Sequence, residues 1–255
     1  MATLEIAPRH GARIGVNAMK YLLALVVSAT TLGGCGGTDS DLEPGAGNDP
    51  GTGTSTLSID GELRARPRLL NARSRGDFDT DLSVRVQLNQ QPVTSGSVTV
   101  TSSGGTVALV FRADSGRWEA IAPGYDEVYV VDVESGMDFI EGVRVDGPDL
   151  HTFSAPTAGE LVDSTLPLEI TWVSSEEAAS ASLEAEEINK IAIVDSGSYT
   201  LAGGALKAEK DNARTNDLEL VRWNRVTPAG AVGGSEVSVA IENRIQVVAM
   251  PNPAL

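Results

Sequence analysis

Residues 82–88 read Leu-Ser-Val-Arg-Val-Gln-Leu, with an apolar side chain at every second position. Successive side chains of a β-strand point to opposite faces, so this spacing places the apolar residues on one face and Ser83, Arg85 and Gln87 on the other. Residues 63–69 repeat the alternation, with arginines between the apolar positions. Both stretches predict strands of an antiparallel sheet that has one buried face and one solvated face.

Similar short patterns continue along the chain, separated by turns rich in Gly, Asp and Ser. The first block has strand candidates at residues 63–69, 82–88, 98–101, 107–111, 118–121, 128–133 and 142–145. The second block has them at residues 166–172, 188–194, 198–201, 217–223, 235–241 and 244–248. Short strands at intervals of about 10 residues are typical of a β-sandwich. The sequence therefore predicts an all-β protein with two tandem β-sandwich domains, at residues 57–154 and 155–255, the alternative being one large sandwich.

Two local patterns predict structure between these strands. Residues 175–187 are rich in Ala and Glu, and we expect a short exposed acidic helix or a solvated loop there. Asp114-Ser-Gly116 recurs as Asp195-Ser-Gly197, and in both cases an aromatic residue stands two positions after the glycine. Because Asp bonds its own backbone and Gly supplies a positive φ, each tripeptide predicts a hairpin turn.

The second block also resembles immunoglobulin-like and fibronectin-like modules of bacterial surface proteins. Residues 168–172 read Leu-Glu-Ile-Thr-Trp and are similar to the strand that carries the core tryptophan of such domains. Asp195-Ser-Gly-Ser-Tyr199 is similar to their Asp-x-Gly-x-Tyr corner, with Leu201 where an antibody domain has its second cysteine. The chain continues too far beyond Tyr199 for one closing strand, which favours a hairpin within the domain. The resemblance implies that both sandwiches are Ig-like.

The N-terminal region has the order of a secretory signal peptide. Lys20 is followed by an uncharged apolar run at residues 21–32 and then by small residues. As a helix, residues 21–34 would span about 21 Å at about 1.5 Å per residue, which is shorter than a hydrocarbon layer of about 30 Å. We therefore expect a signal peptide at residues 1–34, with Met19 as the true start, rather than a permanent transmembrane helix.

The end of this region resembles the lipobox of bacterial lipoproteins. The quartet is Leu32-Gly33-Gly34-Cys35, and it contains the one cysteine of the chain. In that family the thiol is acylated and the chain is cleaved directly before it, so the resemblance implies lipidation of Cys35. Gly36 stands where an aspartate favours inner-membrane retention in enterobacteria, which implies the outer membrane, facing the periplasm or the cell surface. The alternative for Cys35 is a buried free thiol.

Residues 35–56 connect this anchor to the first sandwich. Gly, Pro, Thr and acidic residues dominate, and Leu42 is the one large apolar residue. Such a segment cannot bury enough apolar surface to fold, so we expect a disordered tether with an r.m.s. reach of about 25 Å.

The composition excludes several functions. The chain has 35 acidic and 19 basic residues and a formal charge of −16, whereas a nucleic-acid binder needs a basic face. One cysteine and two histidines exclude an intrachain disulfide and leave too few ligands for a zinc site. We therefore expect no nucleic-acid partner and no cofactor.

Candidate chemical residues are few. His151 is the one histidine after Cys35 and the sole candidate for a Ser-His-Asp base, but no nucleophile motif surrounds it, so we expect a linker residue and no enzyme. Asp77, Asp79 and Asp81 have the alternating spacing of calcium loops. Because Leu82 replaces the glycine that an EF-hand requires, they form only a weak calcium candidate, the alternative being an acidic turn.

The arginines and tryptophans allow two interpretations each. Arg64, Arg66 and Arg68 share one strand face near Arg73 and Arg75, a pattern that protects an edge strand from aggregation. The alternative is contact with anionic polysaccharide or lipid headgroups. The three tryptophans are Trp118, Trp172 and Trp223. We expect them in the core, and the alternative is that they stack on sugar rings.

Together these patterns predict a non-enzymatic, membrane-anchored lipoprotein whose β-sandwich modules act in adhesion, scaffolding or envelope assembly, with an envelope protein or a glycan as partner. The alternative is an extracellular glycan-binding module, which predicts at least two exposed, coplanar Trp or Tyr side chains. A secreted hydrolase would need polar residues that converge with His151 in a cleft.

Overall fold

The computed structural model describes residues 42–209 and 212–251. The predicted signal peptide, Met19, the lipobox residues Leu32, Gly33 and Gly34, and Cys35 lie outside the described residues. Within the described ranges, no helix has both the length and the apolar character that crossing a membrane requires.

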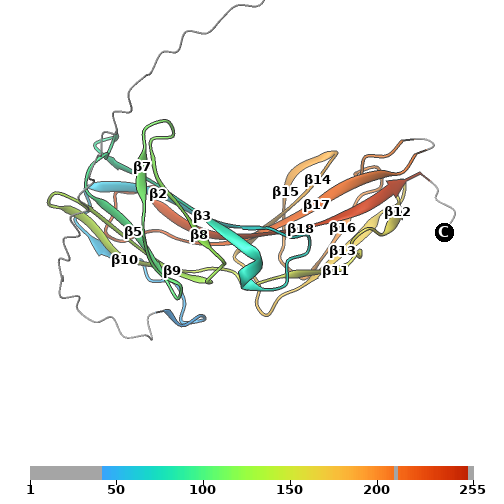
Figure 1. Ribbon diagram of the computed structural model, residues 1–255, viewed down its shortest axis with the longest axis horizontal. Helices are drawn as coiled ribbons and strands as arrows, with labels where there is room; N and C mark the ends of the chain where they lie inside the picture. The colour runs from blue at the N-terminus through green and yellow to red at the C-terminus, as the bar shows by residue number, and fades with distance from the viewer. Residues whose placement is uncertain (1–41, 210–211, 252–255) are drawn as a thin grey trace, which may run out of the picture. The chain divides into compact units, whose positions relative to one another are not determined.

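The described chain folds into three sheets (Figure 1). The first has the order β1-β10-β9-β5-β6 and consists of β1 (Thr52–Gly53), β5 (Ser97–Ser102), β6 (Gly105–Ala108), β9 (Val128–Ser135) and β10 (Asp138–Asp146). The smallest has the order β11-β13-β16 and consists of β11 (Thr152–Ala155), β13 (Leu168–Val173) and β16 (Ser198–Leu201).

The largest sheet has ten strands and the order β15-β14-β17-β18-β2-β3-β8-β7, with β12 beside β18 and β4 beside β3. Its members are β2 (Leu57–Pro67), β3 (Phe78–Leu88), β4 (Gln91–Pro92), β7 (Val110–Arg112), β8 (Arg117–Pro123), β12 (Leu161–Asp163), β14 (Ser180–Ala185), β15 (Ile188–Ile193), β17 (Arg214–Val226) and β18 (Glu236–Met250). β18 runs parallel to β2 and β12, and the other pairs are antiparallel. A 3-10 turn, η2 (Arg75–Asp77), directly precedes β3.

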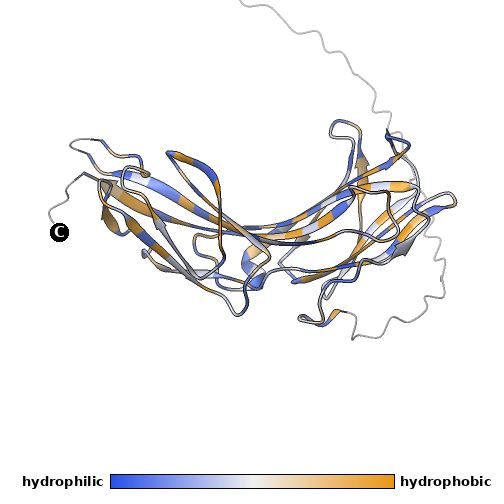
Figure 2. Cartoon of the chain, turned by 180° about the vertical axis from the view of Figure 1, so that it is seen from behind, coloured by the Kyte–Doolittle hydropathy of each residue, from blue (hydrophilic) through white to orange (hydrophobic). Residues whose placement is uncertain are grey.

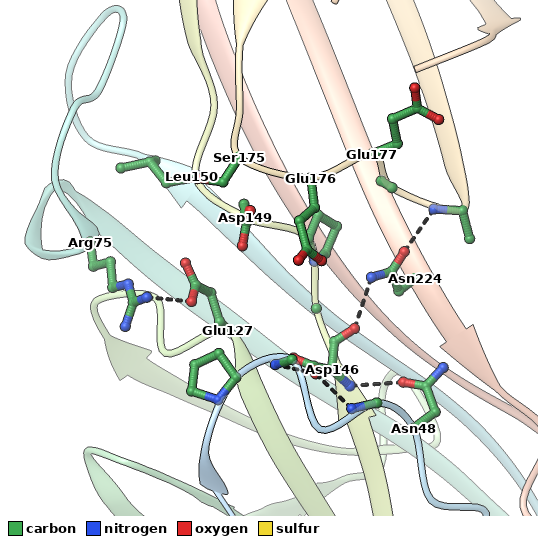
Figure 3. Close-up of a pocket in the computed structure, with 17 residues that line it drawn as sticks. Asn48, Arg75, Glu127, Asp146, Asp149, Leu150, Ser175, Glu176, Glu177 and Asn224 are labelled. Atoms are coloured by element: carbon green, nitrogen blue, oxygen red, sulfur yellow. Dashed lines mark hydrogen bonds and ion pairs between the residues drawn. The ribbon is translucent and has the colours of Figure 1, made fainter. Parts of the chain in front are cut away.

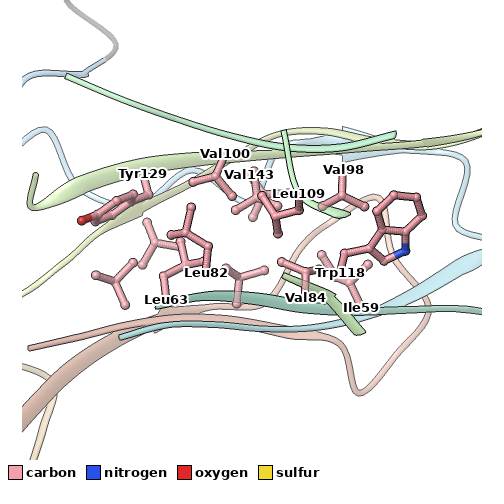
Figure 4. Close-up of a cluster of buried hydrophobic side chains, with 14 of the residues drawn as sticks. Ile59, Leu63, Leu82, Val84, Val98, Val100, Leu109, Trp118, Tyr129 and Val143 are labelled. Atoms are coloured by element: carbon pink, nitrogen blue, oxygen red, sulfur yellow. The ribbon is translucent and has the colours of Figure 1, made fainter. Parts of the chain in front are cut away.

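The ten-stranded sheet is shared by two sandwich cores. Its β2, β3 and β8 half packs against the first sheet, and Leu63, Leu82 and Val84 meet Val100 and Val143 between the layers (Figure 4). Its β14, β17 and β18 half packs against the three-stranded sheet through a second cluster, which includes Ile170, Trp172, Leu183, Leu218 and Val247. Hydrophobic and hydrophilic residues alternate along many of these strands (Figure 2). The prediction of an all-β protein with sandwich cores is confirmed.

One strand serves both cores. Val237, Val239 and Ile241 of β18 belong to the first core, whereas Ile245 and Val247 of the same strand belong to the second. Residues beyond the predicted domain boundary at 154 therefore complete the first sandwich. The two sandwiches are joined by hydrogen-bonded sheet and not only by a linker.

The separate strands predicted at 235–241 and 244–248 are wrong, because β18 continues through the gap. The gap between the two predicted strands contains the polar residue Asn243. This residue is fully buried where β18 passes from one core to the other. Its Nδ2 donates to the carbonyl oxygens of Ala72 and His151 at 2.9 and 2.8 Å, and its Oδ1 accepts the amide of Ala72 at 3.0 Å. These bonds satisfy a side chain that the strand pattern marked as a break.

The prediction of a helix or loop at 175–187 is wrong for Ser180–Ala185, which form β14. β14 pairs with β17 over its whole length, and Ala181, Leu183 and Ala185 enter the second core. The helix-forming alanines and glutamates are overridden because strand pairing and burial decide the local structure.

The two Asp-Ser-Gly turns have different roles. The prediction of a hairpin is confirmed at Asp114-Ser-Gly116, where β7 pairs with β8 and Gly116 has a φ of 66°. At Asp195-Ser-Gly197 it is wrong, because β15 belongs to the ten-stranded sheet and β16 to the three-stranded sheet. The second turn therefore carries the chain across the sandwich, and Asp195 is buried instead of facing solvent.

The predicted tether is wrong for residues 43–56, most of which dock on the first sandwich. The Asp146 carboxylate accepts the amides of Gly45 and Gly47 at 2.7 and 3.1 Å, and Arg144 donates from Nε to the Gly47 carbonyl at 2.8 Å. β1 then pairs with β10. We call residues 43–53 the N-terminal strap. Hydrogen bonds to β10 hold it in place although it has almost no apolar side chains.

We expect Asp146→Ala to loosen the strap without unfolding the body. Loss of the shared acceptor leaves two strap amides without their partner, which costs about 1.4 kcal/mol locally and speeds their hydrogen exchange about tenfold. Exchange measured by mass spectrometry over residues 43–50 checks this. Glu141→Ala removes an exposed carboxylate of the same strand and serves as the control, with unchanged exchange. Equal exchange rates in both variants would contradict the assigned role of Asp146.

Candidate functional site

A hollow in the described chain is lined by residues of both sandwiches (Figure 3). We call it the junction pocket. Its volume is about 890 Å³, and its walls come from the strap, from residues 146–150 and from residues 175–179. The lining is acidic, with one guanidinium, that of Arg75, among the carboxylates Glu127, Asp146, Asp149, Glu176 and Glu177.

Two of these carboxylates contact other groups of the same chain. Arg75 forms an ion pair with Glu127, and Asp146 binds the strap amides. Asp149 and Glu176 are fixed through their backbone, since Arg222 donates to both of their carbonyl oxygens. No group of three or more His, Cys, Asp or Glu residues in the described part of the chain is arranged to hold a metal ion. The junction pocket is therefore an acidic cleft without a metal-binding geometry.

A buried ion pair lies beside the junction pocket. Arg222 and Asp195 have side-chain exposures of 0% and 2%, and the Arg222 Nη2 lies 2.7 Å from the Asp195 Oδ2. The Arg222 Nε donates to the same oxygen at 2.8 Å, and Asp195 also accepts the Trp172 Nε1 and the Ala178 amide, at 2.9 and 2.6 Å. Burial raises the pKa of Asp195, but the bonds from Arg222, Ala178 and Trp172 outweigh it and hold that pKa below its usual value.

This pair was not predicted from the sequence. One feature of the sequence did indicate it. Arg222 lies on the same inward face of β17 as Leu218 and Leu220. A charged residue at an inward position requires a buried partner. The partner, Asp195, was predicted as a residue of a hairpin turn, and nothing in its neighbourhood in the sequence points to Arg222.

His151 is fully buried beside this ion pair and not in a cleft. Neither ring nitrogen has a hydrogen-bond partner in the described part of the molecule, and the ring lies 6.5 Å from that of Phe153 in an edge-to-face arrangement. Burial, assisted by the Arg222 charge, lowers the pKa of His151 to about 3. A neutral, enclosed imidazole lacks the orienting carboxylate and the open approach that a general base needs.

The structure does not bring the three calcium candidates together. Asp77 accepts the amides of Arg73 and Ser74 at 3.1 and 2.9 Å, and these bonds lower its pKa. Asp79 and Asp81 face β2, where Arg68 and Arg66 lie 3.9 and 2.9 Å away, respectively. Each carboxylate therefore has a local protein partner of its own.

The prediction that the arginines protect an edge is wrong, because β2 lies between β18 and β3 inside the ten-stranded sheet. The arginines instead form ion pairs across the outer face of that sheet. Arg64 contacts Glu242 at 2.9 Å and Glu219 at 3.2 Å. Burial and the neighbouring Glu242 raise the pKa of Glu219 from 4.5 to about 7, although Arg64 opposes the rise.

The tryptophans divide into two groups. The core prediction is confirmed for Trp118 and Trp172, which are 7% and 3% exposed and donate from Nε1 to the Val93 carbonyl and to Asp195. It is wrong for Trp223, which is half-buried on the outer face of β17 with the Lys190 Nζ 4.8 Å from its ring centroid. No Trp or Tyr of the described chain is fully exposed, so the predicted platform of two exposed, coplanar aromatic rings is not found there.

Comparisons with known proteins complete the description. No protein-family model matches the sequence. No curated protein sequence matches it either. Similar solved structures include fibronectin(III)-like modules of Clostridium thermocellum CbhA, at 14% identity and a TM-score of 0.24, covering 72% of this chain and 92% of that chain.

A two-domain fibronectin type-III segment of chicken tenascin is 16% identical, with a TM-score of 0.23, over 75% of this chain and 98% of that one. A β-1,2-glucanase from Parabacteroides distasonis is 8% identical, with a TM-score of 0.19, over 76% of this chain and 38% of that chain. At such TM-scores, the fold assignment rests on the strand order and the two cores described above.

Proposed function

We propose that this chain is a lipoprotein of the bacterial outer membrane, held there by acyl groups on Cys35, and that its β-sandwich body acts in adhesion or scaffolding. The observation that carries the proposal is the quartet Leu32-Gly33-Gly34-Cys35 directly after the apolar run 21–32. A small-residue cleavage site followed by the single thiol of the chain meets the chemical needs of acylation. Three acyl chains, at about 0.8 kcal/mol per buried methylene, anchor a protein almost irreversibly.

Because the strap is docked on the first sandwich, the link between the proposed anchor and the body is short. If Cys35 is lipidated, only residues 36–42 separate the membrane from Glu43, whose carbonyl accepts Arg144. At about 3.3–3.6 Å per residue, this link reaches about 25 Å even when fully extended. The body is thus held close to the bilayer and cannot range as far as a tether through residue 56 would permit.

A binding role suits the body better than catalysis. His151, the general-base candidate from the sequence, is enclosed and neutral, and it does not line the junction pocket. Ion-paired sheet faces and a rigid double core provide surfaces that hold partners. We therefore propose a non-enzymatic module, with an envelope component as its partner.

Metabolic labelling of the producing bacterium with alkyne-palmitate tests the anchor. We expect label on the wild-type protein and none on Cys35→Ala, because the acylated atom is the Cys35 sulfur. Gly33→Leu, which leaves the thiol but enlarges the cleavage site, is the matched variant and should accumulate as an unprocessed precursor. Equal labelling of wild type and Cys35→Ala rejects the lipoprotein assignment.

A further inference from the structure

The outer face of the ten-stranded sheet has a line of side chains that crosses five strands. Trp223 of β17 is paired in register with Ala240 of β18, Ala240 with Arg64 of β2, Arg64 with Asp81 of β3, and Asp81 with Ile121 of β8. Neighbouring strands lie about 4.8 Å apart, so this line is about 19 Å long. It places an aromatic ring, a guanidinium and a carboxylate on one straight path.

The surface along this line forms a groove, which we call the outer groove. Two pockets of about 590 and 230 Å³ adjoin there and share Glu62 and Arg64. Small side chains form much of the floor, among them Ser83, Ser238 and Ala240. One end is bounded by Lys190 and Trp223 and the other by Arg112 and Ile121, whose side chain is 69% exposed.

The lining of the outer groove is nearly neutral. Four cationic side chains, Arg64, Arg66, Arg112 and Lys190, stand among three carboxylates, Glu62, Asp81 and Glu119. The chain as a whole has a formal charge of −16, so this balance differs from its general surface. Neither sign of charge is in large excess here, and a neutral ligand with hydroxyl groups finds both donors and acceptors.

Trp223 adds the one contact that hydrogen bonds cannot supply. Its ring is half-buried, which fixes its orientation, and the flexible Lys190 side chain covers it on one side. An aromatic face of this kind offers a large apolar area that packs on a flat ligand. Because Lys190 is exposed, its ammonium can move aside and leave the ring to the ligand.

We propose that the outer groove binds a neutral oligosaccharide or polysaccharide, with one sugar ring stacked on Trp223 and hydroxyl groups of the following sugars bonded to Arg64, Asp81 and Glu62. Sugars combine an apolar ring face with hydroxyls that both donate and accept, which is the pairing of surfaces that the groove presents. The proposal rests on the adhesive role proposed above and assigns its site and ligand class. It needs only one aromatic platform and not the coplanar pair that the sequence analysis required.

Affinity electrophoresis of the detergent-solubilised mature protein tests the site. Native gels contain dextran, laminarin or xyloglucan as neutral probes and polygalacturonate as the acidic probe. We expect at least one neutral probe to slow the wild-type protein. Trp223→Ala should weaken binding at least tenfold, Trp223→Phe should retain most of it because a ring remains, and Ser238→Trp should block it by filling the floor.

Tryptophan fluorescence provides an independent readout. Trp118 and Trp172 are buried, so a binding-induced spectral shift has to come from Trp223 and should vanish in Trp223→Phe while binding persists. The proposal is overturned if no neutral probe slows the protein, if Trp223→Ala binds like the wild type, or if only polygalacturonate binds. Equal labelling of the wild type and Cys35→Ala, with binding of a neutral probe retained, would sink the anchor but leave the groove. Label on the wild type alone, with no neutral probe bound, would overturn the groove but leave the anchor.

Discussion

Replacing Asp195 with alanine is expected to lower the free energy of unfolding by about 3–5 kcal/mol, the cost of leaving a buried charge without its partner. Arg222 is fully buried, and its Nε and Nη2 both bond the same Asp195 oxygen. The substitution also removes the acceptor of the Trp172 indole and of the Ala178 amide. Urea denaturation followed by circular dichroism measures the change.

An exposed carboxylate in a similar ion pair is the matched control. Asp60 lies 2.9 Å from the Arg117 guanidinium, but its side chain is 61% exposed. Asp60→Ala should therefore cost less than about 1 kcal/mol. The double variant Asp195→Leu with Arg222→Met should be more stable than Asp195→Ala alone, because no charge remains buried. Similar losses for Asp195→Ala and Asp60→Ala would contradict the role of the buried pair.

The second large effect is the loss of the His151 contribution to stability as the pH drops from about 6.5 towards 3. The unfolded chain protonates His151 near its ordinary pKa of 6.5, whereas the folded protein does so at about 3. Within this window the unfolded state binds more protons at this site, so the His151 contribution to the free energy of unfolding decreases by about 1.4 kcal/mol for each unit that the pH falls. Its full contribution is present above pH 6.5.

Glu219 acts in the opposite direction over part of this window. Its pKa is about 7 in the folded protein against 4.5 for an ordinary glutamate, so protonation stabilises the fold as the pH falls from 7 to 4.5. Between about pH 6.5 and 4.5 the two contributions have opposite slopes of similar size, so the wild type should lose little stability there. Glu219→Gln should therefore expose the His151 loss below pH 6.5, and His151→Leu should turn it into a gain. Thermal melts between pH 8 and 5 of both variants and the wild type distinguish these effects. An unchanged slope in His151→Leu would show that the buried imidazole is not its source.

The local alternation of residues was sufficient to predict most strands. In 82–88 and 63–65 the apolar residues do line the first core, because a period of two has only one way to bury one face of a strand. Leu69, predicted in the same strand, lies beyond the end of β2 and is exposed. Turn chemistry was also sufficient at Asp114-Ser-Gly116, where Gly116 adopts the left-handed conformation that the hairpin requires.

Predictions failed where a partner distant in sequence decides the structure. The strap lacks apolar side chains and is held by Arg144 and Asp146, which are remote from it in the chain. β14 is a strand because β17 pairs with it. The arginines of β2 are not on an edge because β18 pairs with β2 in parallel, from the far end of the sequence.

The candidate sites follow the same division. The lipobox is a contiguous motif, so the sequence alone supplies the proposed lipidation site at Cys35. The outer groove joins Trp223, Arg64 and Asp81 from three strands, and no spacing in the sequence relates them.

For this protein, the sequence by itself determined the β-strand character, the acidic charge and the motif at Cys35, because each depends on residues that are neighbours in the chain. Only the tertiary structure decided that β18 joins both cores, that Arg222 and Asp195 form a buried pair, and that Trp223 faces a groove. The physical reason is that sheet pairing and burial are long-range interactions, whose free energies depend on which segments meet and not on local propensity.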